Sequence, residues 1–265
     1  LKRLVRTAQG IEAADLVLKN AEVFHAFTGE FIKCDIAITD GYVAGLGTYK
    51  GEREIDLSGR YVTPGFLDGH VHIESSMMSP REFSRAVIPT GTTTVVADPH
   101  EIANVAGVAG IQYMLDATEN LPMNVYVMLP SCVPATPLED SGAKLEAADL
   151  KPFLSHPRVL GLAELMNVPG VLNGDDMVYA KLQLAEHYLV DGHAPGLTGH
   201  PLMGYAAAGI HTDHECATKE QAMERLRALA DHVHRSVVHT RADAASKCAG
   251  RTTAHENRRP HRAHH

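Results

Sequence analysis

The length, composition and charge of the chain exclude several classes of protein. The sequence has 265 residues, of which 45% are hydrophobic and 21% are charged, values typical of one large globular domain or of one domain with a small satellite. No run reaches the ~18 apolar residues of a membrane-spanning helix, and the first residues lack the apolar block of a secretory signal. A net charge of -8 argues against general nucleic-acid binding. We therefore expect a cytoplasmic protein with neither a membrane nor a nucleic-acid partner.

Residues 1–63 are predicted to form a small all-β unit. Residues 15–24, 35–47 and 54–63 are short stretches with the pattern of β-strands. Asp40-Gly41 lies within the second stretch, and an Asp-Gly pair between apolar runs is a strong signal for a tight hairpin turn.

After Pro64-Gly65 the pattern changes to apolar strands that alternate with helical stretches. Six strand-like segments follow one another: FLDGHVH, TTTVVAD, NVYVMLP, VLGLAEL, HYLVDGH and GIHTDH. A repeated strand and helix indicate parallel βα units, so residues 64–229 predict an α/β fold with a parallel sheet. The last helix is expected to begin at Thr218, with an apolar face made of Ala222, Met223, Leu226 and Leu229.

Residues 230–265 differ in composition from the rest of the chain. They hold seven Lys or Arg against three Asp or Glu, seven of the 17 histidines, and no Leu, Ile, Met, Phe or Tyr. Such a segment has almost nothing with which to form a core. One interpretation is a disordered basic arm for RNA or for an acidic partner. The other, which we favour, is an out-of-frame reading of GC-rich coding sequence.

Polar side chains collect near the ends of the predicted strands. They are His70, His72, Asp98, His100, Ser131, Cys132, Glu164, His193, Asp213 and His214. In (β/α)8 barrels, side chains at the C-terminal ends of the strands converge on one active site. Neutral imidazoles and a carboxylate are typical ligands of a divalent transition metal. The pattern therefore predicts a metal site.

Each of these signals is weak when taken alone. A His-x-His pair is expected by chance in a chain with 17 histidines. His70 and His72 are better placed, because residues i and i+2 of a strand face the same side. Taken alone, Glu164 fits a salt bridge or a helix cap, and His193 and His214 fit ordinary loop histidines. The joint arrangement over successive strand ends favours the metal site.

The string PGFLDGHVH, from Pro64 to His72, resembles the first-strand signature of the amidohydrolase superfamily. The segments GHVHIESSMMSPREF, GTTTVVADPHEIANVAG, LPSCVPATPLE, GLAELMNVPGV, VDGHAPGL and TDHECAT resemble the bacterial, metal-dependent adenine deaminase family. The resemblance implies a TIM-type (β/α)8 barrel, incomplete with about six βα units, beside a small N-terminal β-sandwich portion. It also implies hydrolysis of adenine to hypoxanthine and ammonia, a step of purine salvage.

The resemblance further implies a binuclear centre of divalent ions, either Mn²⁺ or Fe²⁺, with Zn²⁺ as an alternative. His70 and His72 would bind the more buried ion, Glu164 would bridge the two ions, and His193 and His214 would bind the second. Two cations that share a hydroxide lower its pKa toward neutrality, and this hydroxide would attack C6 of the purine.

The leaving ammonia also needs a proton. In the superfamily an Asp at the end of the eighth strand supplies it, and about six units are recognisable here, so we expect low activity unless another carboxylate serves. Glu101 is the candidate catalytic residue, although a Glu in the first turn of a helix also stabilises that helix. The candidate substrate-binding residues are Glu74, Asp98, His100 and Cys132, of which Cys132 also fits a packing role.

Two other functions stay open at this point. One is a different single-glutamate amidohydrolase, such as a deacetylase of an N-acetylated sugar, and the other is a non-catalytic remnant. A barrel of six strands would leave unpaired edges on its first and last strands. We therefore expect low solubility or association of copies, with a homodimer as one form.

Overall fold

The computed structural model describes residues 1–136 and 138–232, which belong to two compact units. The first unit is Leu1–Gly65 and the second begins at Phe66. The segment 233–265, which contains most of the basic stretch predicted to lack fixed structure, lies outside the described residues.

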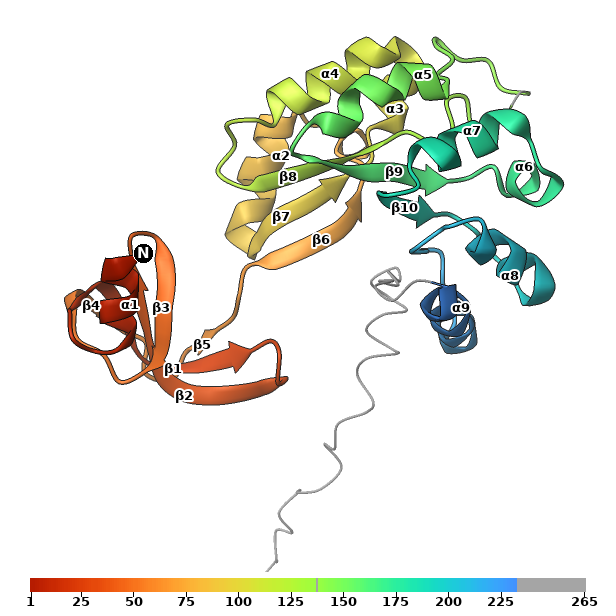
Figure 1. Ribbon diagram of the computed structural model, residues 1–265. Helices are drawn as coiled ribbons and strands as arrows, with labels where there is room; N and C mark the ends of the chain where they lie inside the picture. The colour runs from red at the N-terminus through yellow and green to blue at the C-terminus, as the bar shows by residue number, and fades with distance from the viewer. Residues whose placement is uncertain (137, 233–265) are drawn as a thin grey trace, which may run out of the picture. The chain divides into compact units, whose positions relative to one another are not determined.

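The N-terminal unit is one mixed five-stranded sheet with a short helix (Figure 1). Its elements are α1 (Lys2–Ala8), β1 (Ala14–His25), β2 (Glu30–Thr39), β3 (Tyr42–Gly47), β4 (Gly51–Asp56) and β5 (Tyr61–Val62). Strand β1 pairs antiparallel with β2 and parallel with β4 and β5. The expected sandwich portion is therefore a single sheet over residues 1–65, because the later strands extend the sheet along β1 instead of starting a second layer.

The predicted hairpin at Asp40-Gly41 is confirmed. Asp40 has φ 53° and Gly41 has φ 79°, the two positive values that a type I′ turn requires. The turn connects β2 to β3, and Thr39 pairs directly with Tyr42.

A buried carboxylate, Asp35 on β2, holds neighbouring segments of this unit together. Its side chain accepts hydrogen bonds from the Asn20 amide at 3.0 Å, the Tyr49 amide at 3.1 Å and Lys19 Nζ at 2.6 Å. Burial raises the pKa of Asp35, but these donors, with Lys19 the strongest, outweigh it and hold the pKa below its usual value.

The second unit is a parallel sheet with helices in the connections, which confirms the predicted α/β class. Its strands are β6 (Phe66–Val71), β7 (Thr92–Ala97), β8 (Asn124–Leu129), β9 (Val159–Leu165) and β10 (Leu189–Gly192). They lie in the order β10-β9-β8-β7-β6, and every neighbouring pair is parallel. The connections contain η1 (Glu74–Ser76), α2 (Pro80–Val87), η2 (Ile88–Thr90), α3 (His100–Ala106), α4 (Val108–Ala117), α5 (Ala147–Leu150), η3 (Lys151–Ser155), α6 (Val168–Asn173) and α7 (Asp176–Leu184). Two further helices, α8 (Gly199–Ala207) and α9 (Lys219–His232), follow β10.

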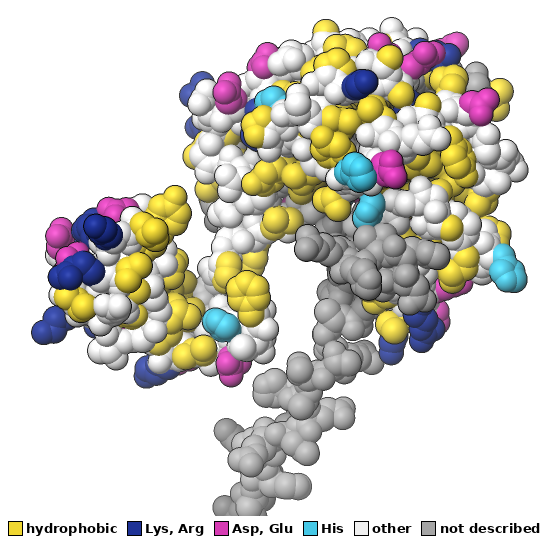
Figure 2. Space-filling model, in the orientation of Figure 1, with side chains coloured by type: hydrophobic (Ala, Val, Ile, Leu, Met, Phe, Trp, Pro, Cys, Tyr) yellow, Lys and Arg dark blue, Asp and Glu magenta, His cyan; other side chains and the backbone are white. Residues whose placement is uncertain are grey.

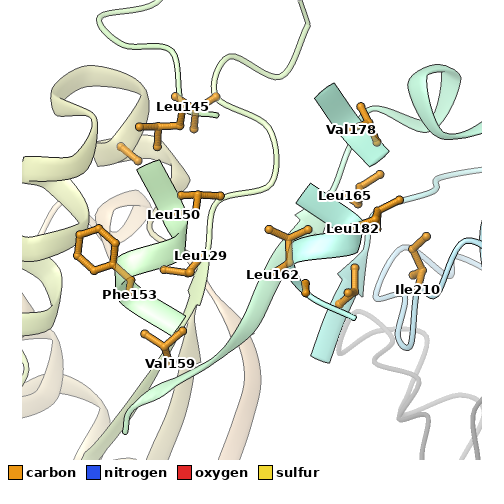
Figure 3. Packing of buried hydrophobic residues seen from close by; sticks show 14 of the residues in the cluster. Leu129, Leu145, Leu150, Phe153, Val159, Leu162, Leu165, Val178, Leu182 and Ile210 are labelled. Atoms are coloured by element: carbon orange, nitrogen blue, oxygen red, sulfur yellow. The ribbon is translucent and has the colours of Figure 1, made fainter. Parts of the chain in front are cut away.

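The main core lies between the strands and the helical connections. Figure 3 shows Leu129 of β8 and Leu162 of β9 among side chains from α5, η3 and α7. Strand β9 is buried along almost its whole length, as expected for a parallel strand that is covered on both faces. A second cluster packs β6 and β7 against α2 and α4, and it includes Ile73, Phe83, Val95 and Met114.

Several helices begin at residues that suit helix starts. Ser79, Asn167 and Asp175 each cap a helix by accepting a hydrogen bond from a backbone amide of its first turn. Pro80 then occupies the first position of α2, where its missing N–H costs no hydrogen bond.

The sixth predicted strand, GIHTDH, does not form. The segment lies beside β10, where the His211 amide donates to Val190 O at 2.8 Å, but the Val190 amide donates to the His211 side chain at 3.2 Å. The side chain thus takes the place of the backbone carbonyl that a parallel ladder needs. The described residues contain five parallel strands where the sequence predicted six.

The predicted apolar face of α9 is only half correct. Ala222 and Leu229 are buried, whereas Met223 and Leu226 are about 40% exposed. Arg225 is fully buried in their place. The helix packs through Ala228 and Leu229 on α8, and Arg225 faces Ala194 in the loop that follows β10 and Asp213 in the loop before α9.

Candidate metal centre

Four of the five residues predicted as metal ligands lie at the carboxyl ends of the parallel strands. His70 lies in β6 and His72 follows it, Glu164 is in β9, and His193 follows β10. His214 lies in the loop between α8 and α9. Histidine side chains are visible beside an acidic side chain near the middle of this unit in Figure 2. The strand ends and this loop thus bring together side chains that are up to 144 positions apart in the sequence.

His70 and His72 face each other through their Nε2 atoms, which are 3.1 Å apart. Nδ1 of His70 lies 2.8 Å from Asp191 Oδ2, and Nδ1 of His72 lies 3.0 Å from the Asp98 backbone oxygen. When both Nδ1 atoms donate to these acceptors, both Nε2 atoms carry lone pairs that point at the same space. Such outer hydrogen bonds are what orients histidines that bind a metal.

Glu164 lies at the centre of the histidines, with only 4% of its surface exposed. Its Oε2 lies 2.7 Å from His193 Nδ1 and 3.0 Å from His214 Nε2. Its Oε1 lies 3.4 Å from both His72 Nε2 and His100 Nδ1. The two carboxylate oxygens therefore face different sets of histidines, which is the arrangement that a carboxylate between two ions needs.

Asp191 on β10 is a site residue that the sequence analysis missed. Its Oδ2 lies 2.8 Å from His70 Nδ1 and 3.5 Å from His214 Nδ1, and its other oxygen accepts from the Thr212 hydroxyl. The signal was present, because Asp191 precedes His193 by two positions and so faces the same side of the strand.

The ligand atoms form four overlapping groups in which all atoms lie within 4.8 Å of one another. These groups are His70, His72, Asp98 and Glu164; His70, Asp191 and His214; His72, His100 and Glu101; and Glu164, His193 and His214. All five predicted ligands fall within them, together with Asp98, His100 and Glu101, which were predicted to act on substrate.

The charges of the cluster are balanced by protons on histidines. Burial lowers the pKa of His214, but Asp191 and Glu164 outweigh it and raise this pKa to about 10. Burial likewise opposes ionisation of His100, yet Asp98 raises its pKa to about 9. The pKa of Glu164, which burial alone would raise, is held far below its usual range by the neighbouring imidazoles. A metal ion that binds here must therefore displace protons.

The donor set fits divalent ions. Glu164 Oε2, His193 Nδ1 and His214 Nδ1 are buried and make no well-aligned hydrogen bond with the described residues, although Glu164 Oε2 and His193 Nδ1 are only 2.7 Å apart. Buried polar atoms without hydrogen bonds are costly unless another partner satisfies them. Imidazole nitrogens around a carboxylate suit Mn²⁺, Fe²⁺ or Zn²⁺.

The other predicted residues lie at different distances from this cluster. Glu101 belongs to the group with His72 and His100, and it also accepts a hydrogen bond from Ser75. Glu74 lies outside the four groups, where it accepts from the Ile102 amide at 3.2 Å, and burial raises its pKa.

A cavity of about 330 Å³ opens beside His100 and Glu101. Its further lining residues are Asn104, Cys132, Ala135, Glu139 and Met166. Three of the predicted catalytic or substrate-binding residues, His100, Glu101 and Cys132, therefore share one cavity.

Tyr205, a buried residue of α8, holds two of the ligand-bearing segments in place. Its hydroxyl donates to Leu165 O at 2.7 Å and accepts from the His193 amide at 3.0 Å. The hydroxyl thus joins the end of β9, next to Glu164, to the end of β10.

Comparison with known proteins identifies the family. Residues 61–264 match the model of the amidohydrolase family. The chain belongs to the amidohydrolase family. It is 60% identical over 226 residues to adenine deaminase 2 of Carboxydothermus hydrogenoformans, and 54% identical over 229 residues to adenine deaminase of Clostridium acetobutylicum. These matches cover 85% and 86% of this chain but only 40% of each relative, so the chain spans less than half the length of these relatives. The resemblance to adenine deaminases is thereby confirmed.

A solved structure supports the fold. Atrazine chlorohydrolase TrzN from Arthrobacter aurescens TC1, solved with zinc, matches with a TM-score of 0.52 and 13% sequence identity. The match covers 86% of this chain and 72% of that chain. Among the residues that the structure describes, no helix is both long and apolar enough to cross a membrane.

Proposed function

We propose that this amidohydrolase acts on adenine, which it hydrolyses to hypoxanthine and ammonia in purine salvage. The observation that carries the proposal is the set of histidines around Glu164, together with 50% to 60% identity to adenine deaminases. We further propose that His70, His72, His193 and His214 hold two divalent ions, Mn²⁺ or Fe²⁺ in preference to Zn²⁺, with Glu164 between them.

The ions and the protein groups have separate tasks in this reaction. When bound, the ions lower the pKa of a water molecule and so make a nucleophile available at neutral pH. Glu164 would supply negative charge to hold the cations. Asp191 and the Asp98 backbone oxygen hold His70 and His72 in the tautomer that leaves their Nε2 atoms free to bind an ion.

Glu101 is the proposed proton carrier. The side chain lines the same cavity as Cys132 and lies in the group with His72 and His100. A carboxylate in this place can take a proton from the attacking water and return it to the leaving nitrogen. Asp98 orients His100 through a 2.9 Å hydrogen bond to Nδ1, and His100 and Cys132 are placed to contact the purine.

The test uses the purified chain, loaded in turn with Mn²⁺, Fe²⁺ or Zn²⁺ and incubated with adenine. Ammonia and hypoxanthine should appear in equal amounts, and the Glu101→Gln variant should be slower by about 10² to 10⁴ with its metal content unchanged. Release of acetate from an N-acetylated sugar, with no ammonia from adenine, would reject the proposed substrate. Full activity of Glu101→Gln would reject only the role of Glu101.

A further inference from the structure

A second cavity, separate from the metal cluster, contains a buried lysine. The cavity measures about 170 Å³ and is lined by residues from β8 to α7: Ser131, Cys132, Val133, Pro134, Ala135, Thr136, Lys144, Leu145, Asn167, Asp175, Met177, Val178 and Lys181. None of the proposed metal ligands is among them. Lys181 on α7 is only 6% exposed, which is rare for a lysine.

The ammonium group of Lys181 has little to compensate its charge. Its Nζ donates to Ser131 O at 2.7 Å, and a lysine has three N–H groups to place. Among the described residues, no carboxylate forms an ion pair with it. Asp175 lines the cavity, but its Oδ1 accepts from the Met177 and Val178 amides at 3.0 and 3.1 Å and so caps α7.

A buried ammonium without a counter-charge is costly, and the cost is avoided either by losing the proton or by binding an anion. Burial does lower the pKa of Lys181, against weaker opposing effects of Cys132, Glu146 and Asp149. The hydrogen-bond donors that line the cavity favour binding of an anion over loss of the proton. Asn167 Oδ1 accepts from the Gly170 amide, so its amide nitrogen is left to donate; Lys144 also lines the cavity, but its Nζ lies 3.4 Å from Glu146 Oε1.

We propose that this cavity binds a small oxyanion, of the size of a carboxylate or a phosphate, against Lys181. A cavity of about 170 Å³ has room for one small acid. Lys181 supplies the charge, and the Asn167 amide supplies a second donor.

The anion would lie next to the proposed substrate cavity. Cys132 and Ala135 line both cavities. Ser131, whose backbone oxygen accepts from Lys181, donates through its hydroxyl to the Glu164 backbone oxygen at 2.5 Å. The two cavities thus share part of their lining, whereas none of the proposed metal ligands lines the anion cavity.

The experiment measures the thermal unfolding of the metal-loaded chain in sodium acetate and in sodium phosphate, against sodium chloride at equal ionic strength. One or both oxyanions should raise the melting temperature along a saturable curve, and the comparison of the two identifies the preferred acid. Lys181→Met should abolish the rise without changing metal content. Lys151→Met, which removes an exposed lysine, should retain it. A rise that persists in Lys181→Met would place the anion elsewhere, for example on the metal ions, and would overturn the proposal.

A second measurement serves if Lys181→Met does not fold. Reductive methylation of the unmutated chain, followed by peptide mass spectrometry, reports the reactivity of each lysine. Acetate or phosphate should slow the labelling of Lys181 along the same saturable curve, while Lys151 is labelled at a constant rate. Equal labelling of Lys181 with and without the oxyanions would also overturn the proposal. Neither measurement depends on turnover of adenine, so a failure here is distinguishable from a failure of the proposed function.

Discussion

Replacing Arg225 by methionine tests how the loops that carry His193 and His214 are held. Arg225 is fully buried, and its Nε donates to Asp213 Oδ2 at 2.8 Å while Nη2 donates to Ala194 O at 2.5 Å. Asp213, itself 1% exposed, also accepts from the Glu215 amide at 2.9 Å. One guanidinium therefore joins the residue after His193 to the residue before His214.

The expected loss of stability follows from the burial of both charges. Arg225→Met leaves the Asp213 carboxylate buried without its counter-charge, and breaking a buried pair in this way costs about 3 to 5 kcal/mol. That is a large part of the ~5 to 15 kcal/mol that stabilises a typical domain. Because both loops would also move, metal affinity should fall by about 10- to 100-fold, as for other residues that support ligands.

Urea unfolding gives the change in free energy, and competition with a chelator gives the metal affinity. Arg227→Met removes an exposed arginine of the same helix and should leave both quantities within about 0.5 kcal/mol of the unmutated chain. The double variant Arg225→Met with Asp213→Asn should recover part of the lost stability, because no uncompensated carboxylate remains. Unchanged stability of Arg225→Met, or a double variant weaker than the sum of the single ones, would refute the argument.

Three further perturbations probe the metal centre and the N-terminal unit. Glu164→Gln keeps the shape of the side chain but removes the central charge, so elemental analysis should find fewer bound ions; an unchanged content would show that Glu164 is not a bridging ligand. Asp191→Asn should weaken metal binding about 10- to 100-fold in a chelator competition, and unaltered affinity would mean that Asp191 does not orient His70. Asp35→Asn should destabilise the chain by about 1.5 to 3 kcal/mol at neutral pH. Because the pKa of Asp35 is lowered in the folded state, its contribution is present above the unfolded value and is lost as the pH falls below about 4, so unfolding curves of the variant and the unmutated chain should converge in acid.

The strands that carry the site could be predicted because their signal is local. Continuous apolar runs bounded by turn residues located β6 to β10, and the Asp40-Gly41 pair located the hairpin of the first unit. The segment at 209–214, which the sequence also predicted as a strand, does not form one. Whether it pairs depends on where the His211 side chain bonds, and no local pattern reports that choice.

The site residues divide in the same way. The spacing of His70 and His72 predicted them as ligands, and the position of Glu164 at the end of a buried strand predicted it. Arg225 could not be found, because helical periodicity assigns an arginine to the solvent face and only its tertiary partner Asp213 explains its burial. Lys181 was missed for the same reason, since its partner Ser131 lies 50 positions away.

The contact between His70 and Asp191 shows how strongly the parallel sheet is curved. The two side chains come from β6 and β10, which are the outer strands of the five-stranded order, and yet their polar atoms lie 2.8 Å apart. Neighbouring strands are spaced by about 4.8 Å, so a flat sheet would separate its outer strands by roughly 19 Å. The sheet must therefore curl strongly about the side of the histidines, as the strands of a barrel do. The same curvature that brings Asp191 to His70 also closes the ligands around Glu164, so the geometry of the candidate metal centre and the curvature of the sheet depend on each other.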